Sequence, residues 1–124
     1  MRFSFNARMK SFKNAFSGIA ILFRFGHNAR IQLMIFIIVI FMGLILKISA
    51  TGWVAIILVS GFVFVCECFN TAIEYLSDAV TQEQNENIRR AKDVAAAGVL
   101  ISAIISVIIG IVVFLPEIYE LIAT

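Results

Sequence analysis

The chain has 124 residues, of which 61% are hydrophobic and 15% charged, and its formal net charge is +2. A soluble domain of this size would be closer to half apolar and a quarter charged. The composition therefore excludes an ordinary soluble domain and predicts one all-α membrane domain over residues 1–124. We expect no nucleic-acid partner.

An amphipathic helix is predicted over residues 3–28. Its apolar residues recur at helical spacing: Phe5, Met9, Phe12, Phe16, Ile19 and Phe23. Basic residues, among them Arg8, Lys10 and Lys13, lie outside this stripe. A helix with an aromatic face and a cationic face lies in the plane of a membrane interface. Packing against neighbouring protein helices is an equally good explanation of the stripe, and both can hold.

Three apolar segments follow, at residues 31–48, 53–78 and 94–115. About 20 such residues cross a bilayer, so each segment is predicted to be a transmembrane helix. The first two are joined by a short connection and should run antiparallel. The third is expected to end at Pro116, the one proline of the chain.

The basic residues indicate an orientation. Of the ten Lys and Arg residues, six precede the first apolar segment, three lie together near residue 90, and Lys47 stands apart. Basic residues gather on the cytoplasmic side of membrane proteins. The N-terminus and the loop at residues 79–93 are therefore predicted to be cytoplasmic, with the C-terminus outside.

A polar stripe interrupts the second apolar segment. Glu67, Asn70, Glu74 and Asp78 follow one another at spacings of three, four and four, which puts them on one face of a helix. Carboxylates inside a membrane are costly and mark functional sites. A helix that starts near Trp53 would place Glu67 about 8 Å below the interface.

This depth suggests a division of roles. A partly desolvated carboxylate such as Glu67 is a good general base, and Glu74, nearer to water, suits Mg²⁺ together with phosphate oxygens. Asn70 can hydrogen-bond beside them, and Lys92 can meet a phosphate. These are the parts that phosphoryl transfer requires. Ion pairs at the cytoplasmic rim would explain the same charges without any catalysis.

The segments ECFNTAIEYLSD and RRAKDVAAAGVL closely resemble the signature of the prokaryotic diacylglycerol kinase and undecaprenol kinase family. The resemblance implies a homotrimeric bundle with an interfacial helix and three transmembrane helices in the bacterial inner membrane. It implies a lipid kinase that uses ATP and Mg²⁺ to convert diacylglycerol to phosphatidic acid, or undecaprenol to undecaprenyl phosphate. The expected partners are the membrane lipid, ATP and further copies of the chain.

The resemblance also implies residue roles. Glu67 matches the catalytic base and Asn70 its polar partner, while Glu74 matches a carboxylate that binds metal and nucleotide. Asn28 and Arg30 match positions ahead of the first transmembrane helix and are assigned, with Glu67, to the lipid substrate. The further nucleotide-binding positions are Glu83, Asn85, Lys92 and Asp93.

One position departs from the family pattern. Gly26 stands where the pattern has a second metal-binding Glu, and a glycine offers no ligand. Either Glu74 and phosphate oxygens hold the metal alone, or His27 or Asp78 gives support, or the chain is an impaired relative that binds nucleotide or lipid without turnover. A small ion transporter would also explain intramembrane carboxylates, but it leaves the A-K-D element unexplained.

Overall fold

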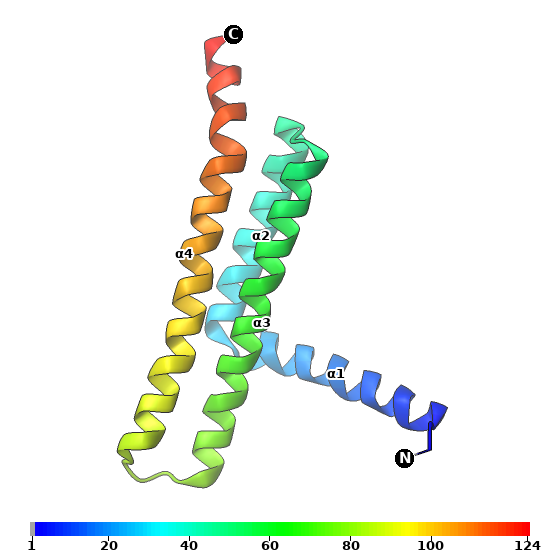
Figure 1. The fold of residues 1–124 in the computed structure, drawn as a ribbon, viewed down its shortest axis with the longest axis vertical. Helices are drawn as coiled ribbons and strands as arrows, with labels where there is room; N and C mark the ends of the chain where they lie inside the picture. The colour runs from blue at the N-terminus through cyan, green and yellow to red at the C-terminus, as the bar shows by residue number, and fades with distance from the viewer. Residues whose placement is uncertain (1) are drawn as a thin grey trace.

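The computed structural model describes residues 2–124, apart from the side chain of His27. Four α-helices and no strand occur in this part of the chain: α1 (Phe5–Phe25), α2 (His27–Leu46), α3 (Ala50–Val80) and α4 (Glu86–Ala123). α2, α3 and α4 form an upright bundle, and α1 leaves it as a lateral arm (Figure 1). The all-helical class predicted from the sequence is confirmed.

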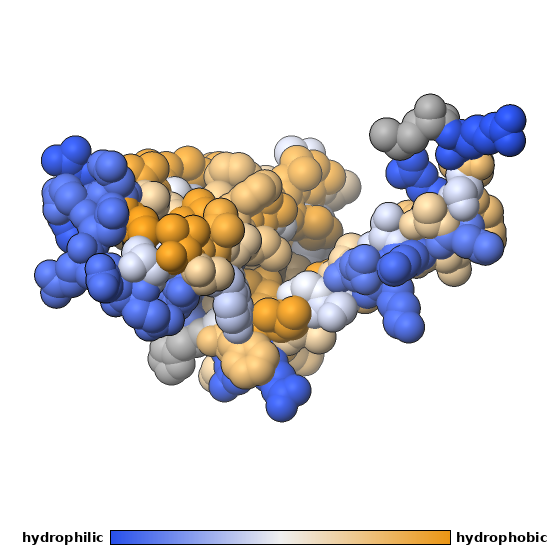
Figure 2. All heavy atoms as spheres, turned by 90° about the horizontal axis from the view of Figure 1, so that it is seen from below, coloured by the Kyte–Doolittle hydropathy of each residue, from blue (hydrophilic) through white to orange (hydrophobic). Residues whose placement is uncertain are grey.

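The arm begins at a capped turn. Ser4 precedes α1, and its hydroxyl accepts a hydrogen bond from the backbone N–H of Ala7 at 3.3 Å, as N-cap residues do. Leu22 is the one buried residue of α1, while side chains of the aromatic stripe such as Phe12 remain mostly exposed. Hydrophilic side chains gather along part of the arm (Figure 2). Both faces of α1 are therefore free for most of its length.

A tight corner joins α2 to α3. Lys47 ends α2 in the left-handed conformation, with φ 54°, and the Ser49 hydroxyl caps α3 by accepting from the Gly52 N–H at 3.1 Å. Gly43 leaves room for the ring of Trp53, because a Cβ at Gly43 would lie 2.7 Å from that ring. These contacts hold the two helices antiparallel.

Little of the apolar surface is buried within one copy of the chain. A small core cluster of Ile48, Ile56 and Phe114 lies near the α2–α3 corner, but most large apolar side chains of α2, α3 and α4 are exposed. Within residues 2–124, three helices are long and apolar enough to cross a membrane. Lipid or neighbouring protein must cover this surface.

The helices extend beyond the apolar segments. α3 continues to Val80 and α4 starts at Glu86, because Asn85 caps α4 by accepting from two backbone N–H groups. α4 also continues through Pro116 to Ala123, where the sequence predicts an end. Proline removes one helical hydrogen bond, and here the helix tolerates that loss. Hydropathy therefore located the crossing segments but not the full helices.

Candidate active site

The polar stripe of α3 lines one cleft. Glu67, Asn70, Glu74 and Asp78 all face a cavity of ≈ 450 Å³. Its other wall is the corner between α1 and α2, which contributes Phe25, Gly26 and Asn28. The helical spacing correctly predicted that the four α3 residues share a face, and the fold brings Asn28 and Gly26 to the same cleft.

Glu67 is the most unusual residue of this cleft. Its side chain is only 2% exposed. Neither its Oε1 atom nor the Oδ1 atom of Asn70 has a hydrogen-bond partner within the part of the chain that the structure describes, although both are buried. Buried polar atoms are nearly always paired in folded proteins, because leaving one unpaired costs free energy. Two adjacent unpaired acceptors are what a site that receives a donor, such as a hydroxyl, presents.

Glu67 also faces a second cavity, of ≈ 260 Å³, which opens between α2 and α4. Asn28 and Gln32 of α2 lie on one side of it, and small residues of α4 such as Ala96 and Ala103 on the other. Gln32 was not predicted as a site residue. The available signal was its position, one helical turn after Asn28 and followed by apolar residues and one glycine to the end of α2.

The loop between α3 and α4 forms a third, water-facing cavity of ≈ 600 Å³. Three residues predicted to bind nucleotide line it: Glu83, Asn85 and Lys92. Asp78 lines both this cavity and the cleft of Glu67. The Lys92 ammonium lies 3.1 Å from the Asp78 carboxylate, so this pair forms the boundary between the two spaces.

The first turns of α4 hold a network of ion pairs. Arg89 binds Glu86 at 2.6 Å and Asp93 at 3.0 Å, and all three side chains are more than half exposed. Hydrogen bonding from Arg89 holds the pKa of the Glu86 carboxyl below its usual value, in the polar turns that precede the apolar part of α4. Asp93, predicted to contact nucleotide, is thus engaged by Arg89. The amide oxygen of Asn85 is likewise engaged as the helix cap.

Arg30 has a structural role at the corner between α1 and α2. Its Nε atom donates to the carbonyl of Phe23 at 2.7 Å, and its Nη2 atom donates to the carbonyl of Arg24. A cation at the C-terminus of a helix is favourable, because the terminal carbonyls lack partners there. The guanidinium therefore ties α2 to the end of α1, and its predicted role toward the lipid stays a prediction.

Gly26 separates α1 from α2, so the amphipathic helix ends at Phe25 rather than continuing to residue 28. A Cβ at Gly26 would collide with the carbonyl oxygen of Leu22 and lie 3.3 Å from the Cβ of Ala29. The corner is therefore built for glycine at this position. The support predicted from His27 concerns a side chain outside the described part of the structure.

The carboxylates suit a metal that arrives with a phosphate ligand. Among the described residues, no group of three or more His, Cys, Asp or Glu side chains could hold a metal by itself. Mg²⁺ usually takes one or two protein carboxylates, together with substrate phosphates and water. Glu74, in the polar cleft and without an ion-pair partner among the salt bridges of the described chain, fits that requirement.

Comparison with known proteins identifies the family. The family model described as prokaryotic diacylglycerol kinase matches residues 13–114. Over 112 residues, the chain is 36% identical to the undecaprenol kinase of Bacillus subtilis. The aligned residues make up 90% of this chain and 91% of that protein. The chain is 35% identical, also over 112 residues, to the diacylglycerol kinase of Synechocystis sp., covering 90% of this chain and 64% of that longer protein.

The chain belongs to the prokaryotic diacylglycerol kinase family. It is accordingly an integral membrane protein and an enzyme of the lipid-kinase class. The resemblance inferred from the α3 and α4 motifs is confirmed.

Proposed function

We propose that this protein transfers the γ-phosphate of MgATP to the hydroxyl of a membrane lipid, with Glu67 as the general base. The observation that carries the proposal is the buried, unpaired carboxylate of Glu67, which faces a polar cleft on one side and a mainly apolar cavity on the other. A base in this position can meet a hydroxyl that arrives from the lipid and a phosphate that arrives from water.

The depth of Glu67 supports the same function. α1 and α3 share a cavity lined on the α3 side by Cys68, Thr71, Ala72 and Tyr75, so α1 meets α3 next to Glu67. An amphipathic helix of this kind lies at the membrane interface. Glu67 would then lie close to the level of a lipid hydroxyl, while the last turns of α3 and the α3–α4 loop extend toward water.

In the proposed step, Glu67 accepts the proton of the lipid hydroxyl while the hydroxyl oxygen forms a bond to the γ-phosphorus. The bond between the γ-phosphorus and the β,γ-bridging oxygen breaks, and ADP leaves with that electron pair. Asn70 lies one turn away in the same cleft and would orient the hydroxyl through its amide. The products are a lipid phosphate and ADP, and Glu67 then releases its proton to water.

The nucleotide side of the site comes from the ends of α3 and α4. Mg²⁺ bound with ATP neutralises phosphate charge, and Glu74 is the carboxylate proposed to hold it. Lys92 would exchange its partner Asp78 for a phosphate oxygen. Glu83, Asn85 and Asp93 are proposed to contact the nucleotide from the loop and the first turns of α4. On the lipid side, Asn28 and Arg30 are proposed to support the substrate.

The lipid is proposed to be a long-chain alcohol of the kind named for the relatives, undecaprenol or diacylglycerol. We also propose a homotrimer in the bacterial inner membrane, with the N-terminus and the α3–α4 loop in the cytoplasm and the C-terminus outside. Nine of the ten Lys and Arg residues would then lie on the cytoplasmic side, where basic residues are retained and ATP is found.

A second candidate function is a catalytically impaired relative that binds nucleotide or lipid. The observation in its favour is Gly26, which lines the cleft of Glu67 and Glu74 without offering a ligand. Loss of one metal carboxylate could cost several kcal/mol of transition-state stabilisation.

The test is transfer of labelled phosphate from ATP by the purified chain in mixed micelles. Diacylglycerol and undecaprenol are offered in parallel, each with and without Mg²⁺. Mg²⁺-dependent labelling of either lipid supports the kinase and shows that Gly26 is tolerated. A folded sample that binds ATP but labels neither lipid would instead support the impaired relative.

A further inference from the structure

We infer that α1 is a docking surface for anionic phospholipids, which its cationic side chains select from the lipids around the enzyme. These side chains form one row along the helix, which we call the cationic flank: Lys10, Lys13 and Arg24. The phospholipids in question surround the enzyme and are not its substrate, so the docking surface does not depend on the proposed function.

The cationic flank borders the aromatic stripe and lies nearly opposite the bundle. At about 100° per residue, Lys10, Lys13 and Arg24 fall within about 60° of one another around the helix, and all three are exposed. Their mean direction is about 110° from the aromatic stripe and about 150° from the buried Leu22. α1 meets α3 on the side of Leu22, where Gly18 also lines the cavity between the two helices. The cationic flank therefore faces away from the bundle.

No acidic side chain of the same region neutralises these cations. The first 66 residues contain seven Lys and Arg residues and no Asp or Glu, since the first acidic residue is Glu67. Among residues 2–124, every ion pair involves a cation of α4 and none involves α1. A leaflet that contains anionic phospholipids attracts each Lys or Arg held near its surface. The charge of α1 is therefore complementary to such a leaflet.

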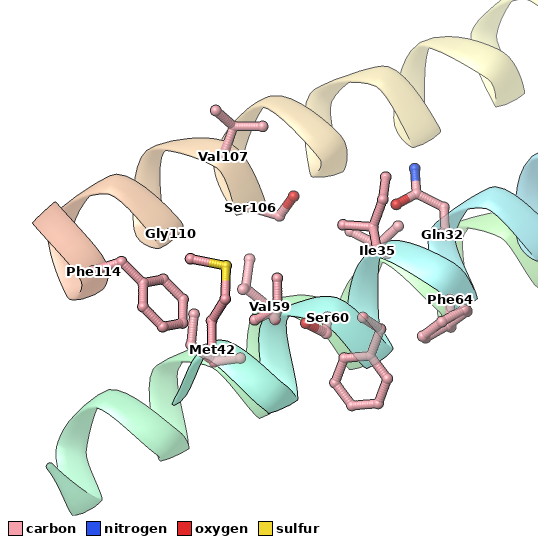
Figure 3. A pocket seen from close by; sticks show the side chains of 14 residues that line it. Gln32, Ile35, Met42, Val59, Ser60, Phe64, Ser106, Val107, Gly110 and Phe114 are labelled. Carbon is pink, nitrogen blue, oxygen red and sulfur yellow. The ribbon is translucent and has the colours of Figure 1, made fainter. Parts of the chain in front are cut away.

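Aromatic contacts show which side of α1 faces the apolar part of the molecule. Phe23, the last residue of the aromatic stripe, packs edge-on against Phe64 of α3, with ring centroids 5.7 Å apart. Phe64 also packs against Phe36 of α2 at 5.9 Å. It lines the apolar cavity inside the bundle, at the same end as Gln32 and away from Phe114 (Figure 3). The aromatic stripe thus continues the apolar wall of the bundle, and the cationic flank beside it lies at the level of the lipid headgroups.

The position of the two lysines favours contact with lipid. α1 leaves the bundle as a lateral arm (Figure 1), and Lys10 and Lys13 lie in its outer half. Phe12 and Phe16, on the aromatic stripe, are 63% and 69% exposed. Such rings enter the acyl boundary, while the ammonium groups reach the headgroups on flexible four-carbon stems. One helix can therefore hold both parts of a phospholipid.

A second copy of the chain is a poorer partner for the cationic flank. Its Asp78, Glu86 and Asp93 are already paired with cations of α4, and Glu117 and Glu120 lie at the end of α4 away from α1 (Figure 1). A phospholipid phosphate can reach any point of the flank and forms charge-assisted hydrogen bonds with Lys and Arg. In phosphatidylcholine the choline group offsets this negative charge, whereas an anionic phospholipid retains it. The charges therefore favour an anionic phospholipid.

The test asks whether the lipid next to α1 is enriched in anionic phospholipid. Phe12→Trp/Trp53→Phe moves the one tryptophan of the chain to the exposed stripe of α1, and gel filtration in detergent checks its folding. The protein is reconstituted in vesicles of phosphatidylcholine and phosphatidylglycerol in equal parts. One or the other phospholipid carries brominated acyl chains, which quench tryptophan fluorescence. The ratio of the two quenching constants is the lipid selectivity at α1.

We expect phosphatidylglycerol to be selected about fivefold, the effect of one favourable charge contact at a membrane surface. Lys10→Gln/Lys13→Gln should lower the selectivity to less than about twofold, whereas Lys10→Arg/Lys13→Arg keeps the charge and should keep the selectivity. Lys47→Gln, which removes a cation at the α2–α3 corner, should leave it unchanged. A selectivity near one in the parent, or no loss in Lys10→Gln/Lys13→Gln, would overturn the inference.

Spin-labelled phospholipids repeat the comparison on the unaltered sequence and on the lysine variants, without a new tryptophan. The motionally restricted fraction of each labelled phospholipid gives the selectivity. Weak quenching by both brominated phospholipids would show that protein covers α1 and would exclude the docking surface as well. Neither measurement needs turnover. Selectivity for phosphatidylglycerol in a protein that phosphorylates no lipid would therefore support the docking surface and contradict only the proposed kinase function.

Discussion

The carboxylates at the start of α4 and the carboxylate of Glu67 on α3 lie in opposite environments. Glu86 and Asp93 are exposed and paired with Arg89, whereas Glu67 is buried and its Oε1 atom has no partner among the described residues. Exposed pairs contribute about 0–1 kcal/mol to stability, while a buried, unpaired carboxylate reduces it. The fold alone therefore accounts for the carboxylates at the start of α4, because each has an ion-pair partner on the same helix. Glu67 has no such partner in the described part of the chain, and under the proposed function the hydroxyl of the lipid substrate supplies it.

The largest effect is expected at Glu67. Glu67→Gln keeps the shape of the side chain but removes its ability to take a proton, so phosphate transfer should fall about 10²–10⁴-fold, the usual contribution of a general base. The measurement is the initial rate of lipid phosphorylation with labelled ATP.

Glu120→Gln provides the control, because Glu120 is exposed near the other end of α4. It should retain the parental rate. Full activity of Glu67→Gln would remove Glu67 from the role of base.

A smaller effect is expected at the pair between α3 and α4. Lys92→Ala should lower kcat/KM for MgATP by about 10–100-fold, or roughly 1.4–2.7 kcal/mol, because a cation near the phosphates is lost. Titration of ATP at saturating lipid measures this change.

Arg90→Ala is the matched cation deletion, since Arg90 pairs with exposed Glu86 rather than with Asp78. It should change the same constant less than twofold. Equal losses in Lys92→Ala and Arg90→Ala would show that kcat/KM for MgATP depends on the total positive charge near the nucleotide and not on the position of Lys92.

At Gly26, two variants separate backbone from charge. Gly26→Ala should lower the thermal midpoint, because a Cβ collides with the Leu22 carbonyl. Gly26→Glu carries the same strain but places a carboxylate beside the cleft, so its activity should exceed that of Gly26→Ala by up to about tenfold if charge near the phosphates is limiting. Activity and Tm are measured for both variants in the same micelles. Indistinguishable activities would show that a carboxylate at this position adds nothing.

The smallest effect is expected at Arg89. Arg89→Ala breaks two exposed pairs and should lower the thermal midpoint only slightly, because exposed ion pairs contribute little to stability. The loss should shrink further in high salt, because exposed charges are screened. A large drop in the thermal midpoint, measured in detergent, would mean that this network of ion pairs stabilises the fold substantially.

The sequence was sufficient for features that depend on one helix. Helical periodicity alone determines that Glu67, Asn70, Glu74 and Asp78 share a face, and they do line one cleft. Hydropathy likewise located the crossing segments. It overlooked the continuation past Pro116, because a single missing hydrogen bond does not end a helix that is otherwise intact.

Features that depend on two helices were not predictable in this way. Gln32 was missed because its spacing does not reveal which side of α2 faces Glu67. The capping role of Arg30 depends on the break at Gly26, which places the end of α1 within reach of α2. The ion pair of Arg89 with Asp93, in contrast, lies within α4 at a spacing of four, so helical periodicity could have indicated it.

The arm formed by α1 has a consequence for how the protein fits membranes of different thickness. α1 is tied to the bundle beside Glu67, through Leu22 and the bonds of Arg30, and its long axis points sideways (Figure 1). With α1 in the membrane interface, as proposed, it would fix from one leaflet how deeply the bundle is immersed. In a thicker or thinner bilayer, the hydrophobic mismatch would fall on the α2–α3 corner and the far end of α4, and the depth of Glu67 would stay the same.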